Sequence, residues 1–251
     1  VEALADDGCD GIIVTHGTDT LEETAFLLDL TLPAEKPVVV VGAMRPADAV
    51  GYDGLRNFAN AVRVAGHPDA AGRGVLVVMG DRVFGARDVR KVRTRGAEAF
   101  AGFPRESLAL VSPSSLEWFG APWRGGVGAR FAWQDDLPEV AIIYVHAALD
   151  ADAAARQIGP ATRGVVVAGV GEGNMPDRVR QHLIRRAADG MAVVRASRAD
   201  EALVDREPQD DANRFVAARA LNPQKARILL QLLLADGETD PAAIQRAFDL
   251  G

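Results

Sequence analysis

The sequence has little of what marks several classes of protein. Cys9 is the one cysteine among 251 residues, which excludes an internal disulfide and a zinc site built on thiolates. No stretch approaches the ~18 consecutive apolar residues of a membrane span. The net charge of -7 argues against a nucleic-acid-binding surface, because such a surface needs a basic face. With 48% hydrophobic residues, the chain instead predicts one large globular domain or two modest ones.

Lysine is also scarce. Only Lys36, Lys91 and Lys225 occur among the 28 basic residues, so the other 25 are arginines. Arginine hardly ever loses its proton, whereas lysine can. If the protein needs a basic amine for chemistry, there are three candidates.

Apolar runs alternate with segments of helical spacing over the first 80 residues. This alternation predicts parallel βαβ units, in which helices cover a buried sheet. Thr20 and Glu23 have the spacing of a capping box at the start of the first helix. The strands are expected at 10–15, 37–42 and 74–79, and the helices at 21–30 and 54–65.

A second α/β set follows an irregular stretch. Residues 84–133 contain short strand-like pieces, and 117–136 looks like a linker. Asn222 and Pro223 predict the N-cap and first position of a C-terminal helix. The pattern therefore predicts two α/β domains with a boundary near 125–138. The second set has expected strands at 140–145, 164–169 and 192–195, and expected helices at 151–157, 177–188 and 241–248.

Ligands of open parallel sheets bind at the carboxyl ends of the strands, where Thr15 to Thr20 stand. This turn holds hydroxyls, a carboxylate and an imidazole, so it could activate a nucleophile or water, with backbone N–H groups stabilising an oxyanion. Alternatively, Thr18, Asp19 and Thr20 only cap the helix.

Three further features of the sequence bear on the chemistry. Lys91 is either a solvated surface residue or a desolvated base beside a carboxylate. The loop from Gly169 to Asn174 fails as a dinucleotide loop, because Asn174 stands where the third glycine would be. The four histidines are isolated in the sequence, so no catalytic metal is expected.

Residues 11–21, G-I-I-V-T-H-G-T-D-T-L, resemble the second signature of the bacterial-type L-asparaginases, the asparaginase/glutaminase amidohydrolases. The resemblance covers essentially the whole chain. It implies an α/β fold of two domains: a larger N-terminal domain (1–124) with a flavodoxin-like parallel sheet whose first strand is missing here, a linker (125–138), and a smaller parallel α/β domain (139–251). The other matching segments are 36–46, 53–54, 73–79, 87–91, 168–174 and 221–227.

The resemblance also implies roles for single residues. Thr18, Asp19 and Lys91 correspond to the family's Thr–Lys–Asp triad. The backbone N–H groups of Thr18 and Ala43 correspond to its oxyanion donors, and Asp19 would also hold the α-amino group of the substrate. Asn174 resembles a residue that a neighbouring subunit contributes, and Glu207 is assigned to a second such position through a gapped local match. A homotetramer, built as a dimer of dimers, is implied with them.

The implied reaction is hydrolysis of the side-chain amide of L-asparagine to L-aspartate and ammonia, without a cofactor. Alternatives are a glutaminase-asparaginase of broader specificity, a relative acting on amidated tRNA, a truncated non-catalytic scaffold that binds an amino acid, and an unrelated doubly wound ligand binder.

Three features of the family do not occur in these residues. They are the Gly-Gly-Thr-Ile motif with the attacking threonine, the tyrosine-bearing lid, and the Ser-Gln or Ser-Glu pair that holds the substrate. We therefore expect these 251 residues alone to be inactive. Partners other than the substrate and further copies of the chain, such as nucleic acid or a membrane, are not expected. The lack of a disulfide favours the cytoplasm.

Overall fold

The computed structural model describes residues 8–33, 35–122 and 130–250. The chain forms two units, Val1–Trp133 and Gln134–Gly251, each with its own central sheet. The expected linker at 125–138 stays a prediction, and its residues 125–129 lie outside the described part of the chain.

The first unit is built on a six-stranded mixed sheet of order β1-β2-β3-β4-β7-β8. Its first three strands are parallel: β1 (Ile12–Thr15), β2 (Val38–Val41) and β3 (Val75–Met79). The other three add antiparallel: β4 (Arg82–Gly85), β7 (Ala109–Val111) and β8 (Leu116–Trp118). A separate hairpin pairs β5 (Val89–Lys91) with β6 (Phe100–Gly102).

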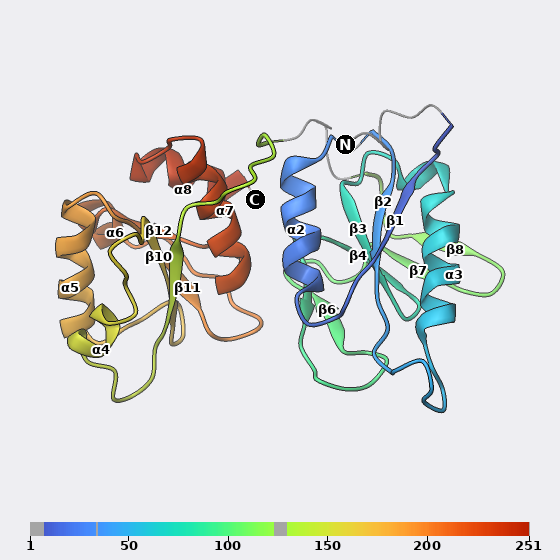
Figure 1. Cartoon of the computed structure of the whole chain (residues 1–251), viewed down its shortest axis with the longest axis horizontal. Helices are drawn as coiled ribbons and strands as arrows, with labels where there is room; N and C mark the ends of the chain where they lie inside the picture. The colour runs from blue at the N-terminus through green and yellow to red at the C-terminus, as the bar shows by residue number, and fades with distance from the viewer. Residues whose placement is uncertain (1–7, 34, 123–129, 251) are drawn as a thin grey trace. The chain divides into compact units, whose positions relative to one another are not determined.

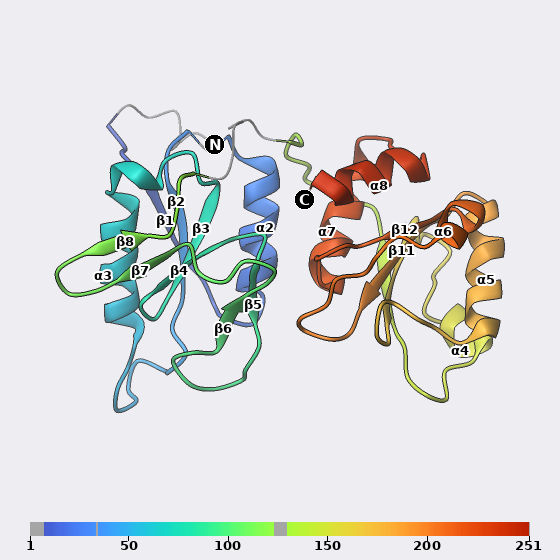
Figure 2. The same ribbon diagram turned by 180° about the vertical axis from the view of Figure 1, so that it is seen from behind.

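Helices α2 (Leu21–Thr31) and α3 (Gly54–Ala65) cover opposite faces of this sheet (Figures 1 and 2). Alternate valines of β2 face each side: Val38 and Val40 pack in one apolar cluster with α2, and Val39 and Val41 in another with α3. A strand buried on both faces has no polar alternation, which is why β2 is an unbroken run of valine. A short 3-10 helix, Pro68–Ala70, follows α3.

Two local predictions in this unit are wrong. The Thr20 side chain makes no capping hydrogen bond; its carbonyl instead accepts the N–H groups of Glu23 and Thr24, both at 3.1 Å. The segment 117–136, which looks like a linker in the sequence, begins inside the edge strand Leu116–Trp118. A strand of three residues is too short to show a period-2 pattern, so its residues could not be distinguished from a linker.

The second unit has a four-stranded parallel sheet of order β12-β11-β10-β9. Helices α4 and α5 lie on one of its faces and α7 on the other (Figures 1 and 2). The strands are β9 (Val140–Tyr144), β10 (Gly164–Gly169), β11 (Ala192–Ser197) and β12 (Phe215–Ala217). The helices are α4 (Ala151–Ala155), α5 (Asp177–Ala188), α6 (Pro208–Asn213), α7 (Pro223–Ala235) and α8 (Pro241–Leu250).

The predicted start of α7 is confirmed. The Asn222 side chain accepts the backbone N–H of Lys225 at 3.2 Å, and Pro223 occupies the first helical turn. By contrast, α6 and β12 were not predicted. Among the described helices, none has both the length and the apolar character needed to cross a membrane.

Candidate functional site

The loops that follow β1 and β2 are held together at the carboxyl end of the sheet. The His16 N–H donates to the Val41 carbonyl at 2.8 Å, which extends the parallel pairing past both strands. A Cβ atom at position 42 would lie 2.8 Å from the His16 carbonyl oxygen and 3.0 Å from Thr18 Cγ2. Gly42 is therefore required for the two loops to approach this closely.

Lys91 brings two of the predicted catalytic residues together. Its Nζ donates to Thr18 Oγ1 at 2.9 Å and to Asp19 Oδ1 at 2.5 Å, although these residues are 73 and 72 positions away. The Lys91 side chain is 17% exposed, whereas that of Asp19 is 94% exposed. Lys91 is thus not a solvated surface residue but the centre of a hydrogen-bonded chain that opens to solvent at Asp19.

Glu22 is part of this arrangement and was missed from the sequence. Its Oε2 accepts the backbone N–H of Lys91 at 2.8 Å, and its side chain is buried. The bond ties β5 to the first turn of α2, directly after the loop that carries Thr18 and Asp19. A glutamate in a first helical turn is ordinarily explained by the helix dipole. The sequence around Glu22 therefore did not indicate a hydrogen-bond partner 69 positions away.

Lys91 also controls the ionisation of Asp19. The hydrogen bond from Lys91, and then its positive charge, lower the pKa of Asp19 below its ordinary value, against a smaller opposing effect of burial. Because the pKa is depressed, Asp19 keeps its negative charge further into acid than a free aspartate would, and loses it only as the pH falls through the lowered pKa.

The loop after β2 is held by the first turn of α3. Asp53 Oδ2 accepts the N–H of Met44, and its Oδ1 the N–H of Arg45, both at 3.0 Å. Asn57 Nδ2 donates to the Gly42 carbonyl at 2.9 Å and to Asp53 Oδ2 at 3.0 Å. Burial alone would raise the pKa of Asp53, but these hydrogen bonds outweigh it and lower the pKa below its ordinary value.

Ala43, the other predicted oxyanion donor, lies in this loop. Within the part of the chain that the structure describes, neither the Ala43 N–H nor the Thr18 N–H donates a hydrogen bond. Ala43 also lines a pocket of about 410 Å³ at the carboxyl ends of β1 and β2. The pocket is also lined by large side chains in and just before α3: Tyr52, Leu55 and Phe58.

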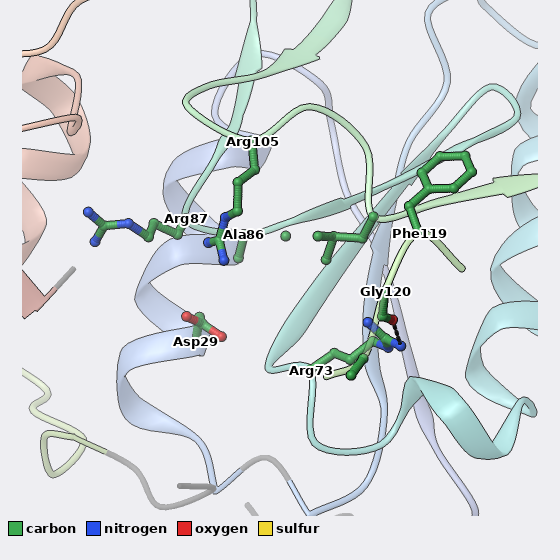
Figure 3. A pocket seen from close by; sticks show the side chains of 10 residues that line it. Asp29, Arg73, Ala86, Arg87, Arg105, Phe119 and Gly120 are labelled. Atoms are coloured by element: carbon green, nitrogen blue, oxygen red, sulfur yellow. Dashed lines mark hydrogen bonds between the residues drawn. The ribbon is translucent and has the colours of Figure 1, made fainter. Parts of the chain in front are cut away.

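A smaller pocket, of about 160 Å³, is lined by Asp29, Arg73 and Arg105 among others (Figure 3). Its charged groups serve the fold. Asp29 accepts the Val75 N–H at 2.8 Å, and Arg105 donates to the buried Asp88 at 2.6 Å. Arg73 donates to the Gly120 carbonyl at 2.7 Å. We assign it no chemistry.

Asn174 stands in the turn after β10 in the second unit, with its side chain exposed. Its backbone N–H and carbonyl bond to those of Val170, at 2.8 and 2.9 Å. Gly171 and Gly173 adopt φ of 53° and 84°, in the left-handed region that glycine tolerates best. The glycines of this motif therefore shape a turn that presents the Asn174 amide.

Arg195 joins this turn to Glu207 and was not predicted. Its fully buried guanidinium binds both oxygens of Asp210, at 2.8 and 2.6 Å, and donates to the Glu172 carbonyl at 2.8 Å. Its Nη1 also lies 3.2 Å from Glu207 Oε1. Glu207 is the N-cap residue of α6, where it forms a capping box with Asp210. The turn that carries Asn174 is thus linked to Glu207 through one buried cation.

The described residues contain no group of three or more His, Cys, Asp or Glu side chains placed to hold a metal ion.

Known proteins match along nearly the whole chain. Residues 1–124 match the family model described as "Asparaginase, N-terminal", and residues 139–248 that of the "Glutaminase/Asparaginase C-terminal domain". The chain is 42% identical to a "Probable L-asparaginase periplasmic" of Haemophilus influenzae, over 96% of the chain and 70% of that protein. It is 41% identical to "L-asparaginase 2" of Escherichia coli, over 97% of the chain and 71% of the relative. A "Glutaminase-asparaginase" of Pseudomonas aeruginosa is 40% identical, over 99% and 70%.

The first of these names overturns the expected cytoplasmic location, because a relative with 42% identity is named periplasmic. The expectation rested on the absence of a disulfide. A chain with the single cysteine Cys9 cannot form an internal disulfide in any compartment, so that absence carried no information on location.

Replacing Lys91 by methionine should raise the pKa of Asp19 toward its ordinary value, because both effects that lower it come from Lys91. Carboxyl carbon chemical shifts followed by NMR against pH measure this directly. Asp53 is the internal control, since its lowered pKa depends on Met44, Arg45 and Asn57 instead. An unchanged Asp19 titration in Lys91→Met would contradict the ion pair.

Replacing Arg195 by methionine should lower the free energy of unfolding by about 3–5 kcal/mol, because it leaves the Asp210 carboxylate buried without its partner. Urea denaturation measures the loss. Arg206→Met is the matched control in the same unit: Arg206 pairs with Asp211 at the surface, and its loss should leave the midpoint nearly unchanged. Equal midpoints for the two variants would show that the Arg195 cluster is not a structural anchor.

Proposed function

The chain belongs to the asparaginase family of amidohydrolases. On this premise we propose that the protein expressed from its natural gene hydrolyses the side-chain amide of L-asparagine to L-aspartate and ammonia. The observation that carries the proposal is the placement of Lys91 Nζ between the Thr18 hydroxyl and the Asp19 carboxylate. The names of the relatives support the choice of substrate.

In this proposal Thr18, Lys91 and Asp19 form a proton relay. A hydroxyl adds to the amide carbonyl carbon, its proton passes through the relay to the amide nitrogen, and the C–N bond breaks to release ammonia. Water then cleaves the acyl intermediate and releases aspartate. The family's attacking threonine belongs to a Gly-Gly-Thr-Ile motif that these 251 residues do not contain. The proposal therefore assigns to them the relay and the groups that stabilise charge.

The backbone N–H groups of Thr18 and Ala43 are the proposed oxyanion donors. Neither donates to an acceptor among the described residues, so both are available for the oxygen of the tetrahedral intermediate. Asp19 has a second proposed role. One of its oxygens accepts from Lys91, and its exposed carboxylate can pair through the other with the α-ammonium group of the substrate.

Asn174 and Glu207 are proposed to complete the site of a neighbouring subunit in a homotetramer, a dimer of dimers. Arg195 supports a joint role, because it donates to the Glu172 carbonyl in the Asn174 turn and pairs with Glu207 at the start of α6, which fixes the spacing between the two.

A glutaminase-asparaginase of broader specificity is the second candidate, favoured by the 40% identity to the Pseudomonas aeruginosa protein of that name. The ratio of kcat/KM for L-asparagine and L-glutamine distinguishes the two. A ratio near one would favour the second candidate.

Ammonia release by the protein expressed from its natural gene tests the proposed reaction. Lys91→Met should lower kcat by at least ~10²-fold, the lower end for loss of a general acid–base group, with an unchanged far-UV circular dichroism spectrum. Lys36→Met, which removes another of the three lysines, is the matched control and should keep kcat. If the natural protein releases no ammonia from either amide, it is a binding scaffold rather than this enzyme.

Mixing two inactive variants tests the subunit roles. In Lys91→Met the relay of every site is broken, and in Asn174→Ala every site lacks the Asn174 side chain of its neighbour. If Asn174 acts across the interface, each mixed dimer regains one intact site of two, so randomly mixed dimers should recover about a quarter of the natural activity.

Co-expression of two differently tagged chains, followed by purification on both tags, supplies the mixed species, and light scattering gives the mass of the assembly. Activity of the mixed species no higher than that of the separate variants would place Asn174 outside the neighbouring site.

A further inference from the structure

The peptide unit between Gly42 and Ala43 has a partner at each end. Its N–H is the proposed oxyanion donor of Ala43, and its carbonyl, which belongs to Gly42, accepts Asn57 Nδ2 at 2.9 Å. We propose that Asn57 is a positioning residue that aims the Ala43 N–H at the oxyanion by holding the other end of the same peptide. This inference rests on the proposed function.

The physical reason is the planarity of the peptide. The C=O and N–H of a trans peptide point in opposite directions within one rigid plane, so fixing the oxygen fixes the direction of the N–H. Donation to the carbonyl also polarises the peptide and makes its N–H a stronger donor. A single side-chain bond therefore sets both the direction and the strength of the oxyanion contact.

Gly42 makes such a restraint necessary. Glycine is required here because any Cβ would meet the His16 carbonyl at 2.8 Å. Glycine is also the residue whose backbone rotates most freely, so the chain itself does not fix the orientation of the 42–43 peptide. The close approach of the two loops thus creates a freedom that a side chain has to remove.

Asn57 is well placed to remove it. The side chain is fully buried, and Nδ2 donates both to the Gly42 carbonyl and to Asp53 Oδ2, while Oδ1 accepts the Gly80 N–H at 3.1 Å. Two acceptors on one side and one donor on the other fix which way the amide points. Asp53 in turn holds the next two N–H groups, so three consecutive peptides rest on the first turn of α3.

A purely structural role would be to tie α3 to the sheet, and Asn60 provides the comparison. It lies one turn further along α3, is buried, and donates from Nδ2 to the Gly80 carbonyl at 2.9 Å, with Asp81 Oδ1 at 3.4 Å. Asn57 and Asn60 thus have the same side chain, helix and kind of acceptor, and only Asn57 bonds to the peptide of Ala43.

The experiment compares Asn57→Asp with Asn60→Asp in the protein expressed from its natural gene. Each change keeps the side-chain shape and replaces the NH₂ donor by oxygen. We expect kcat of Asn57→Asp to fall at least ~10-fold and toward the ~10²–10³-fold loss of a missing oxyanion donor, with KM within about twofold. Asn60→Asp should keep kcat within about twofold, although both variants should unfold at a lower temperature.

Acid should partly rescue the Asn57→Asp variant. Once protonated, the new carboxyl can donate to the Gly42 carbonyl again, and the neighbouring Asp53 carboxylate raises the pH at which this happens. The ratio of its kcat to that of the natural protein should therefore rise as the pH falls, whereas the ratio for Asn60→Asp should stay level. Equal losses of kcat in both variants, or a loss confined to KM, would overturn the proposal.

Crystal structures of the two variants give a readout that does not depend on turnover. The Gly42–Ala43 peptide should be rotated, or present in two orientations, in Asn57→Asp and unchanged in Asn60→Asp. If the natural protein releases no ammonia, the proposed function fails, yet these structures still decide whether Asn57 sets the peptide. An unrotated peptide in Asn57→Asp overturns it. If Asn57→Asp does not fold, Asn57→Ser takes its place. The serine side chain is too short to donate to the Gly42 carbonyl, and it adds no charge.

Discussion

The ammonium group of Lys91 is the point on which the site depends. It joins the loop after β1, which provides Thr18 and Asp19, to a hairpin that follows the third parallel strand. Glu22 holds the backbone of the same lysine, so the two ends of Lys91 are attached to the first turn of α2 and to the loop directly before it. The helix beginning at Leu21 is therefore the common support of the relay.

A second constraint acts on the neighbouring loop. Parallel pairing of β1 and β2 places their ends side by side, and Gly42 lets the loops beyond them close to contact distance. The polar residues at the start of α3 then take up the backbone groups that this close approach leaves outside the sheet. The helices on the two faces of the sheet therefore hold different parts of the site. Helix α2 supports the side chains of the relay, and α3 supports the backbone of the loop after β2.

The parts of the fold that could be predicted from the sequence are those with a local cause. The valine runs of β2 and β3 and the Asn222–Pro223 start of α7 were predicted because each pattern reports burial or capping within a few residues. The antiparallel half of the first sheet was foreseen only as short strand-like pieces within 84–133. Strands β7 and β8 have three residues each and β4 begins at the charged Arg82, so none of them is an apolar run as long as that of β2.

The same limit applies to the site. The resemblance pointed to Thr18, Asp19 and Lys91, and the scarcity of lysine narrowed the choice of amine. Glu22 and Asn57 were not predicted, because their hydrogen-bond partners lie 69 and 15 positions away and the neighbouring residues do not indicate such contacts. The predicted Thr20–Glu23 capping box was wrong for a related reason. The spacing shows only that a capping hydrogen bond could form, and the Thr20 side chain does not make it.

The distance along the chain between Thr18 and Lys91 also has a consequence for folding. Closing a loop of 73 residues costs conformational entropy that local structure does not return, and contacts of this span form only once the elements between them are in place. Helix α2 requires no such closure, since its hydrogen bonds are local. A partly folded chain therefore already contains the helix without containing the relay, so recovery of catalysis during refolding follows completion of the first sheet rather than the return of helical signal.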